Sequence, residues 1–191
     1  VNLRKTVLTV AILNLIYFGI EFYFGRIYDS VSLIGDSIDF LEDASINILI
    51  ALAIGWSLRK RQVVTYFLAL LLLVPGVAFL WNAIHQLVSP EVPVGRGMSV
   101  VGFGALLVNT FCALLIARHR KEESGLVTAA YYSARNDAIA NLLIISAGFL
   151  TLLSPTIWPD LVIGVVIFVM NADAAKEVLE ASKRDGKAHR A

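Results

Sequence analysis

The sequence predicts an all-α membrane protein with six transmembrane helices. Of the 191 residues, 58% are hydrophobic and only 16% are charged, and the mean hydropathy is +0.74. A soluble domain carries charge on roughly a quarter of its residues, so this composition argues against a soluble enzyme. The formal net charge of +1 gives no bulk electrostatic attraction to nucleic acid, and we expect no such partner.

Six stretches are apolar enough to span a membrane, for which a helix needs about 20 residues. They cover approximately residues 7–24, 33–58, 63–88, 98–117, 127–153 and 161–180. The first stretch follows Arg4 and Lys5, as the core of a signal peptide would, but it ends without a small-x-small cleavage motif. We therefore expect it to be retained as a span.

The later stretches differ in polarity. The third and fourth contain no charged residue over 63–87 and 98–117, whereas the second and fifth carry acidic and amide side chains. The sixth is the weakest, because its uninterrupted apolar part ends at Met170 and polar residues follow. We expect this helix to continue for a turn or two beyond the membrane.

The basic residues predict the orientation of the spans. They cluster before the first span and after the second, fourth and sixth: Arg4, Lys5, Arg59, Lys60, Arg61, Arg118, Arg120, Lys121, Lys183, Arg184, Lys187 and Arg190. The alternate connections hold only Arg26 and Arg96. By the positive-inside rule both termini are cytoplasmic. We expect a six-span domain over residues 1–182 in the cell (inner) membrane, a short polar tail over 183–191, and no C-terminal soluble domain.

Acidic residues line one face of the second span. Asp36, Asp39 and Asp43 fall within a narrow sector at 100° per residue. Asn47 continues this sector one turn on, whereas Glu42 lies off it. Four carboxylates within eight residues cannot all stay ionised in a low dielectric without a counter-charge. A bound cation would supply that charge.

Polar residues also occur within the first, fourth and fifth spans, where they usually face a cavity or a partner. They are Asn14, Glu21, Asn109, Ser133, Asn136, Asp137 and Asn141. Ser133, Asp137 and Asn141 lie at i, i+4 and i+8 and share one helix face. Asn14 and Glu21, seven residues apart, also lie on one side of their helix.

Structural explanations stay open for several of these residues. Asp36 is also explained by a position at the outer interface or by helix capping, and Arg135 with Asp137 by an intramembrane ion pair. A headgroup or dimer contact suits Glu42 better than a ligand role, and an interfacial position suits His85. Under these explanations the polar residues are structural, and the protein is a membrane scaffold or partner protein that carries no solute across the membrane.

The chain resembles the membrane domain of the cation diffusion facilitator family over about residues 5–180. The second span of that family commonly reads Asp-Ser-x-His-x-x-x-Asp, or has Asp in place of His, and residues 36–43 match the Asp version. The fifth span of the family supplies His or Asp, three further residues, and then Asp. Here Asp137 fits the second position and Ser133 stands at the first. The Trp-Pro-Asp160 sequence before the sixth span is also similar to family members.

The resemblance implies a secondary transporter that exports a divalent metal cation by proton antiport and works as a homodimer. It implies that Asp39, Asp43 and Asp137 bind the ion. Because Ser133 is a poor metal ligand, Asn136 or Asn141, Ser133 itself or water would complete the shell. The other candidates for the polar lining are Asp36, Ser133, Asn14, Glu21 and Asn47.

All the predicted ligands are oxygen donors. Zinc sites favour Cys and His, whereas oxygen-only shells suit harder ions. We therefore expect a weaker preference for zinc than in a His-bearing family member, with manganese and ferrous iron as further candidate substrates. The carboxylates would exchange the ion for protons, since both compete for the same oxygens. No nucleophile–base pair is visible, so we expect neither enzymatic activity nor a cofactor.

Overall fold

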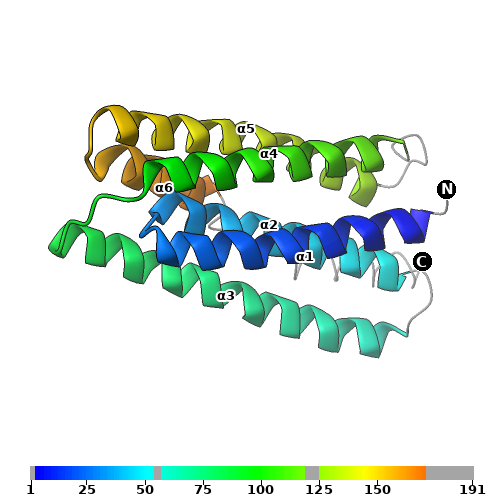
Figure 1. Cartoon of the computed structure of the whole chain (residues 1–191). Helices are drawn as coiled ribbons and strands as arrows, with labels where there is room; N and C mark the ends of the chain where they lie inside the picture. Colours follow the sequence, from blue (N-terminus) through cyan, green and yellow to red (C-terminus); the bar gives the residue numbers. More distant parts are fainter. Residues whose placement is uncertain (1–2, 54–56, 119–124, 171–191) are drawn as a thin grey trace.

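The part of the chain that the structure describes forms six α-helices, as the sequence predicts (Figure 1). The computed structural model describes residues 3–53, 57–118 and 125–170, without the side chains of residues 53, 125–136 and 170 and of parts of 58–75. The helices are α1 (Leu3–Ile27), α2 (Val31–Ala53), α3 (Leu58–Val88), α4 (Gly95–Ala117), α5 (Gly125–Leu153) and α6 (Trp158–Met170). The described residues contain no strand. The predicted tail and the predicted sixth span beyond Met170 lie outside this part of the chain.

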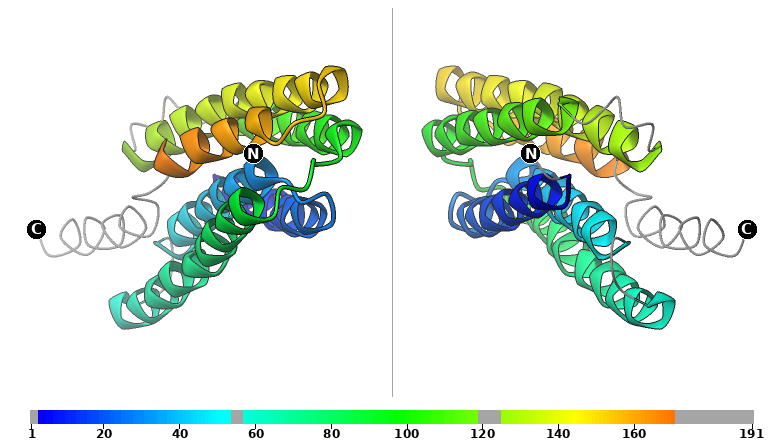
Figure 2. Two further views of the ribbon diagram at one scale, coloured as in Figure 1. Left: turned by 90° about the vertical axis from the view of Figure 1, so that its left-hand side faces the viewer. Right: turned by 90° about the vertical axis from the view of Figure 1, so that its right-hand side faces the viewer.

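The helices run up and down along one common direction (Figure 1). One end of the bundle, which we call the turn end, holds the connections between α1 and α2, α3 and α4, and α5 and α6. Helix α2 is central, because it packs against α1, α3, α5 and α6. Figure 2 shows α4, α5 and α6 grouped on one side of α1 and α2, with α3 on the other.

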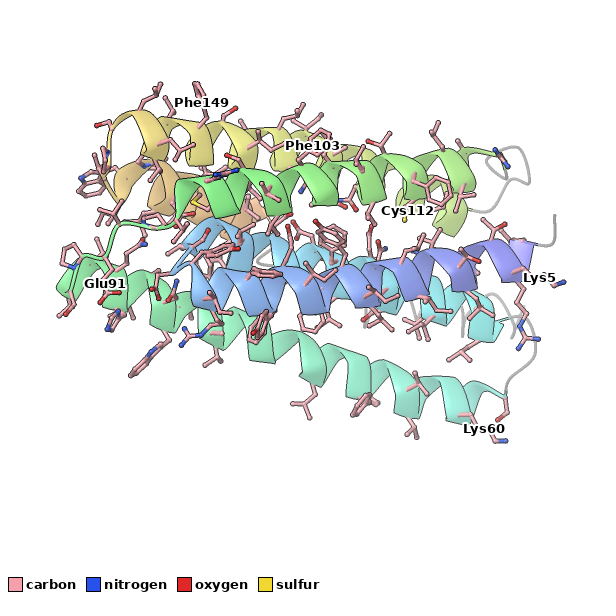
Figure 3. The ribbon with its side chains drawn as sticks, in the orientation of Figure 1. Lys5, Lys60, Glu91, Phe103, Cys112 and Phe149 are labelled. Atoms are coloured by element: carbon pink, nitrogen blue, oxygen red, sulfur yellow. The ribbon has the colours of Figure 1, made fainter. Side chains whose placement is uncertain are left out.

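The outer surface of the bundle is apolar. Ile16, Phe103 and Phe149 expose 57%, 54% and 58% of their surface, and Phe149 points away from the bundle in Figure 3. Most of the described acidic and amide side chains lie inside instead. Among the described helices, α1 and α4 are long and apolar enough to cross a membrane, by length and composition. An apolar exterior around a polar interior is the arrangement that a lipid environment favours.

The turn between α1 and α2 is tightly fixed. Asp29 has a φ of 50°, a left-handed conformation that Asp tolerates. The Ser30 N–H donates to the Gly25 carbonyl (2.9 Å) and so closes α1. The Ser30 hydroxyl then caps α2 by accepting from the Leu33 N–H (3.2 Å). Gln86 of α3 donates to the Asp29 carbonyl (2.8 Å), which ties the turn to a third helix.

Asp160 of α6 completes the cap of α2. Its carboxylate accepts hydrogen bonds from the Val31 N–H (2.6 Å) and the Ser32 N–H (3.0 Å). It also accepts from the hydroxyls of Ser30 (2.8 Å) and Ser32 (2.5 Å). The first N–H groups of a helix have no partner within the helix, and the helix dipole favours negative charge there. Gly164 permits this approach, since a Cβ at that position would lie 2.8 Å from the Ser32 nitrogen.

Candidate metal-binding site

The acidic face of α2 points into the bundle. Asp36 is fully buried, and Asp39, Asp43 and Asn47 expose only 6%, 3% and 1% of their surface. These side chains therefore lie within the protein, where α1, α3, α5 and α6 surround α2. Asp36 is not a helix cap, because Ser30 holds that position six residues earlier.

Asp137 brings a further carboxyl group to this face from α5. It exposes 9% of its surface, and its carboxyl lies beside that of Asp43. Asp39 lies within electrostatic range of both. We call Asp39, Asp43 and Asp137 the central carboxylates. The structure gathers them between α2 and α5, while their role as ion ligands stays a prediction.

The central carboxylates are not drawn together into a compact set of ligands. In the described part of the chain, no three His, Cys, Asp or Glu side chains are grouped tightly enough to hold a metal. Ion binding would therefore need these side chains to close further or to use amide and water oxygens. Ser133 and Asn136 are predicted to help complete the shell, but their side chains lie outside the described part of the structure. The side chain of Arg135, which could form an ion pair with Asp137, also lies outside it.

Asn141 connects α5 to two other helices. Its Nδ2 donates to Asp36 Oδ2 (2.6 Å), and its Oδ1 accepts from Asn109 Nδ2 of α4 (3.2 Å). All three side chains are buried. An amide oxygen has two lone pairs, so the Asn141 oxygen retains capacity for a cation. Asn109 thereby orients a residue that the sequence predicts as a candidate ligand.

Two further amides lie on the bundle interior. Asn14 of α1 is fully buried, and its Oδ1 accepts from the Cys112 thiol at 3.7 Å, between α1 and α4 (Figure 3). Asn47 donates through Nδ2 to the Asp43 carbonyl (2.8 Å). The Asn14 Nδ2 and the Asn47 Oδ1 have no hydrogen-bond partner. Both groups thus extend the polar interior towards the end of the bundle opposite the turn end.

Known proteins share this membrane domain. The family model described as the cation efflux transmembrane domain matches residues 7–184. The chain belongs to the cation efflux family, the cation diffusion facilitators. This confirms the resemblance carried by the second and fifth spans, and it makes the chain a membrane protein.

Individual relatives in the cation efflux family are distant. The chain is 24% identical over 195 residues to the zinc transporter ZitB of Yersinia pestis, and equally so to ZitB of Yersinia pseudotuberculosis serotype I. Each alignment covers 95% of this chain and 62% of the relative. The chain thus spans less than two thirds of the length of these relatives.

Glu42 of this cation efflux domain does not lie where the sequence predicts. A headgroup or dimer contact was expected, but Glu42 exposes only 8% of its surface and lies within electrostatic range of Asp39 and Asp137. The prediction fails because it assumes that one side of α2 faces outward. Every residue from Ser30 to Ser45 is buried, so α2 has no outward side over this range.

Asp160 is a second residue whose importance sequence reasoning missed. It lies at the start of α6, far along the chain from the helix whose N-terminus it caps. In the sequence, Asp160 stands out only as part of the Trp-Pro-Asp160 stretch that is similar to family members. Two serines at the start of a span, Ser30 and Ser32, were the available signal, since such residues typically cap helices.

Proposed function

We propose that this cation efflux domain exports a divalent metal cation from the cytoplasm in exchange for protons, and that the central carboxylates bind the ion. The observation that carries this proposal is the burial of three carboxyl groups from α2 and α5 within electrostatic range of one another. Like charges in a poorly solvated place are unfavourable unless protons or a cation offset them. Family membership supports a cation as the substrate.

Oxygen donors dominate the proposed site. We infer that the shell combines the central carboxylates with amide oxygen from Asn141 or Asn136 and with water. Such a shell suits manganese or ferrous iron as well as zinc. His85, the one histidine within the described residues, is exposed in the last turn of α3. The distant relatives are zinc transporters, whereas the donor set here favours harder ions.

Competition between ion and protons would drive transport. A divalent cation that binds carboxylates displaces their protons, and protons in turn displace the cation. The same three residues would thus couple the two fluxes without a separate relay. The direction of export and the coupling itself rest on the family resemblance.

In the proposed orientation both termini are cytoplasmic and the turn end faces outward. Lys5 and Lys60 lie at the end opposite Glu91 in Figure 3, in keeping with the positive-inside rule. The family resemblance further supports a homodimer in the inner membrane, with residues 1–182 as the spanning domain and 183–191 as a cytoplasmic tail.

A non-transporting scaffold is the alternative function. Hydrogen bonds link Asp36, Asn141 and Asn109, and a scaffold could use such bonds only to join helices. Under this alternative the polar interior stabilises the bundle and no ion crosses it.

Uptake of Mn²⁺ into proteoliposomes distinguishes the two functions. We expect the wild-type protein to raise uptake above that of protein-free liposomes, and Asp137→Asn to abolish this increase. Asp29→Asn is the matched control, because it makes the same chemical change in the turn, where Asn tolerates the same backbone conformation. Equal uptake by wild type, Asp137→Asn and empty liposomes would favour the scaffold.

A further inference from the structure

Glu21 of α1 is the least satisfied acidic side chain in the bundle. It is 0% exposed, and neither of its carboxyl oxygens has a hydrogen-bond partner. The nearby Tyr17 hydroxyl does not donate a hydrogen bond to Glu21, because it donates to the Val101 carbonyl instead (2.6 Å). A buried, unpaired carboxylate is costly, so Glu21 must either hold a proton or pair with a cation that the described side chains do not provide.

Asp36 of α2 faces Glu21 across the α1–α2 contact. The two carboxyl groups lie within hydrogen-bonding distance of each other, yet neither can donate unless a proton is shared. Asp36 Oδ2 accepts from Asn141, but Asp36 Oδ1 has no partner and Asp36 is fully buried. Three carboxyl oxygens from two helices are thus left without donors.

Two amide side chains, Asn141 and Asn109, fix the orientation of one carboxyl oxygen of this pair, Asp36 Oδ2. Asn141 directs its amide nitrogen to Asp36 because Asn109 donates to its oxygen. The amide therefore positions Asp36 Oδ2 and leaves Asp36 Oδ1 for another partner. Two carboxylates, with a combined charge of −2 when ionised, match the charge of one divalent cation.

We propose that Glu21 and Asp36 form a second divalent-cation site, nearer the turn end than the central carboxylates. Asp36 lies seven residues before Asp43 along α2, roughly 10 Å nearer the turn end, while Asp39 lies between them and within reach of Asp36. Glu21 and Asp36 also lie within two helical turns of the connection between α1 and α2. An ion that leaves the central carboxylates towards the turn end meets this pair next. The inference rests on the proposed function, since it makes the pair a step on the same path.

Counting the Mn²⁺ ions bound at equilibrium by the full chain in detergent tests this second site. Elemental analysis after dialysis against Mn²⁺ should give about two ions per wild-type chain and about one for Glu21→Gln. Asp137→Asn should also retain about one ion. Glu91→Gln, the same change at an exposed residue of the turn end, should retain both. Glu21→Asp, which keeps the carboxylate, should bind both ions with on the order of tenfold weaker affinity at one site.

The outcomes separate this inference from the proposed function. Wild-type protein that binds one ion or none, with no loss in Glu21→Gln, overturns the second site and leaves a proton shared between Glu21 and Asp36. A loss in Glu21→Gln with no loss in Asp137→Asn supports the second site and contradicts the central one. A loss in Glu21→Gln together with unchanged thermal unfolding excludes a folding defect as its cause.

Discussion

Asp43 and Asp137 come from different helices, and their carboxyl groups lie beside each other. An ion bound between them, as we propose, would replace protons, so Mn²⁺ binding should acidify a weakly buffered solution of the protein. Asp43→Asn or Asp137→Asn should abolish this proton release, because an amide holds no exchangeable acid proton. A pH indicator in detergent solution measures the effect, with Asp29→Asn as control. Proton release that persists in both variants would show that residues other than Asp43 and Asp137 exchange protons for the ion.

Ser133 occupies the position at which the fifth span of family members supplies His or Asp. Because imidazole favours zinc more than a hydroxyl does, Ser133→His should shift the preference from Mn²⁺ towards Zn²⁺. Competition binding of the two ions to wild type and variant measures the shift, and Ser146→His on the exposed side of α5 is the control. An unchanged preference in Ser133→His would remove residue 133 from the ion shell.

At the scale of elements, the position of α2 depends on α6. Asp160→Ala would leave two N–H groups of α2 and two serine hydroxyls without their acceptor. We expect it to lower the free energy of unfolding by about 3 kcal/mol. Asp160→Asn keeps an acceptor oxygen and should cost less, and Glu91→Ala should cost nothing measurable. Thermal unfolding in detergent compares the three, and equal stability of Asp160→Ala and wild type would contradict this role.

The sequence predicts each helix because apolar runs of spanning length are a local property. It also predicts that Asp36, Asp39 and Asp43 share a face, since helical periodicity alone determines this. It cannot predict the burial of Glu42 or the cap by Asp160, because both depend on which helices pack around α2. The pairing of Glu21 with Asp36 is non-local for the same reason.

At the scale of the whole molecule, the orientation in the membrane would set the direction of the proposed transport. A reporter fused after Arg190 should be cytoplasmic, and one inserted in the connection over residues 90–97 should be external. Phosphatase and fluorescence reporters, which are active on opposite sides of the membrane, measure this directly. If the Arg190 fusion proves external, the proposed direction of export is reversed.

We propose that the bundle exchanges a divalent cation for protons. Mn²⁺ uptake into inside-out membrane vesicles with an imposed pH gradient tests this exchange, comparing wild type with Asp137→Asn. An acidic interior should accelerate uptake by the wild type, because protons leaving the vesicle drive the cation inward, and it should have no effect on Asp137→Asn. Wild-type vesicles that take up no more Mn²⁺ than Asp137→Asn vesicles under any gradient would contradict the account.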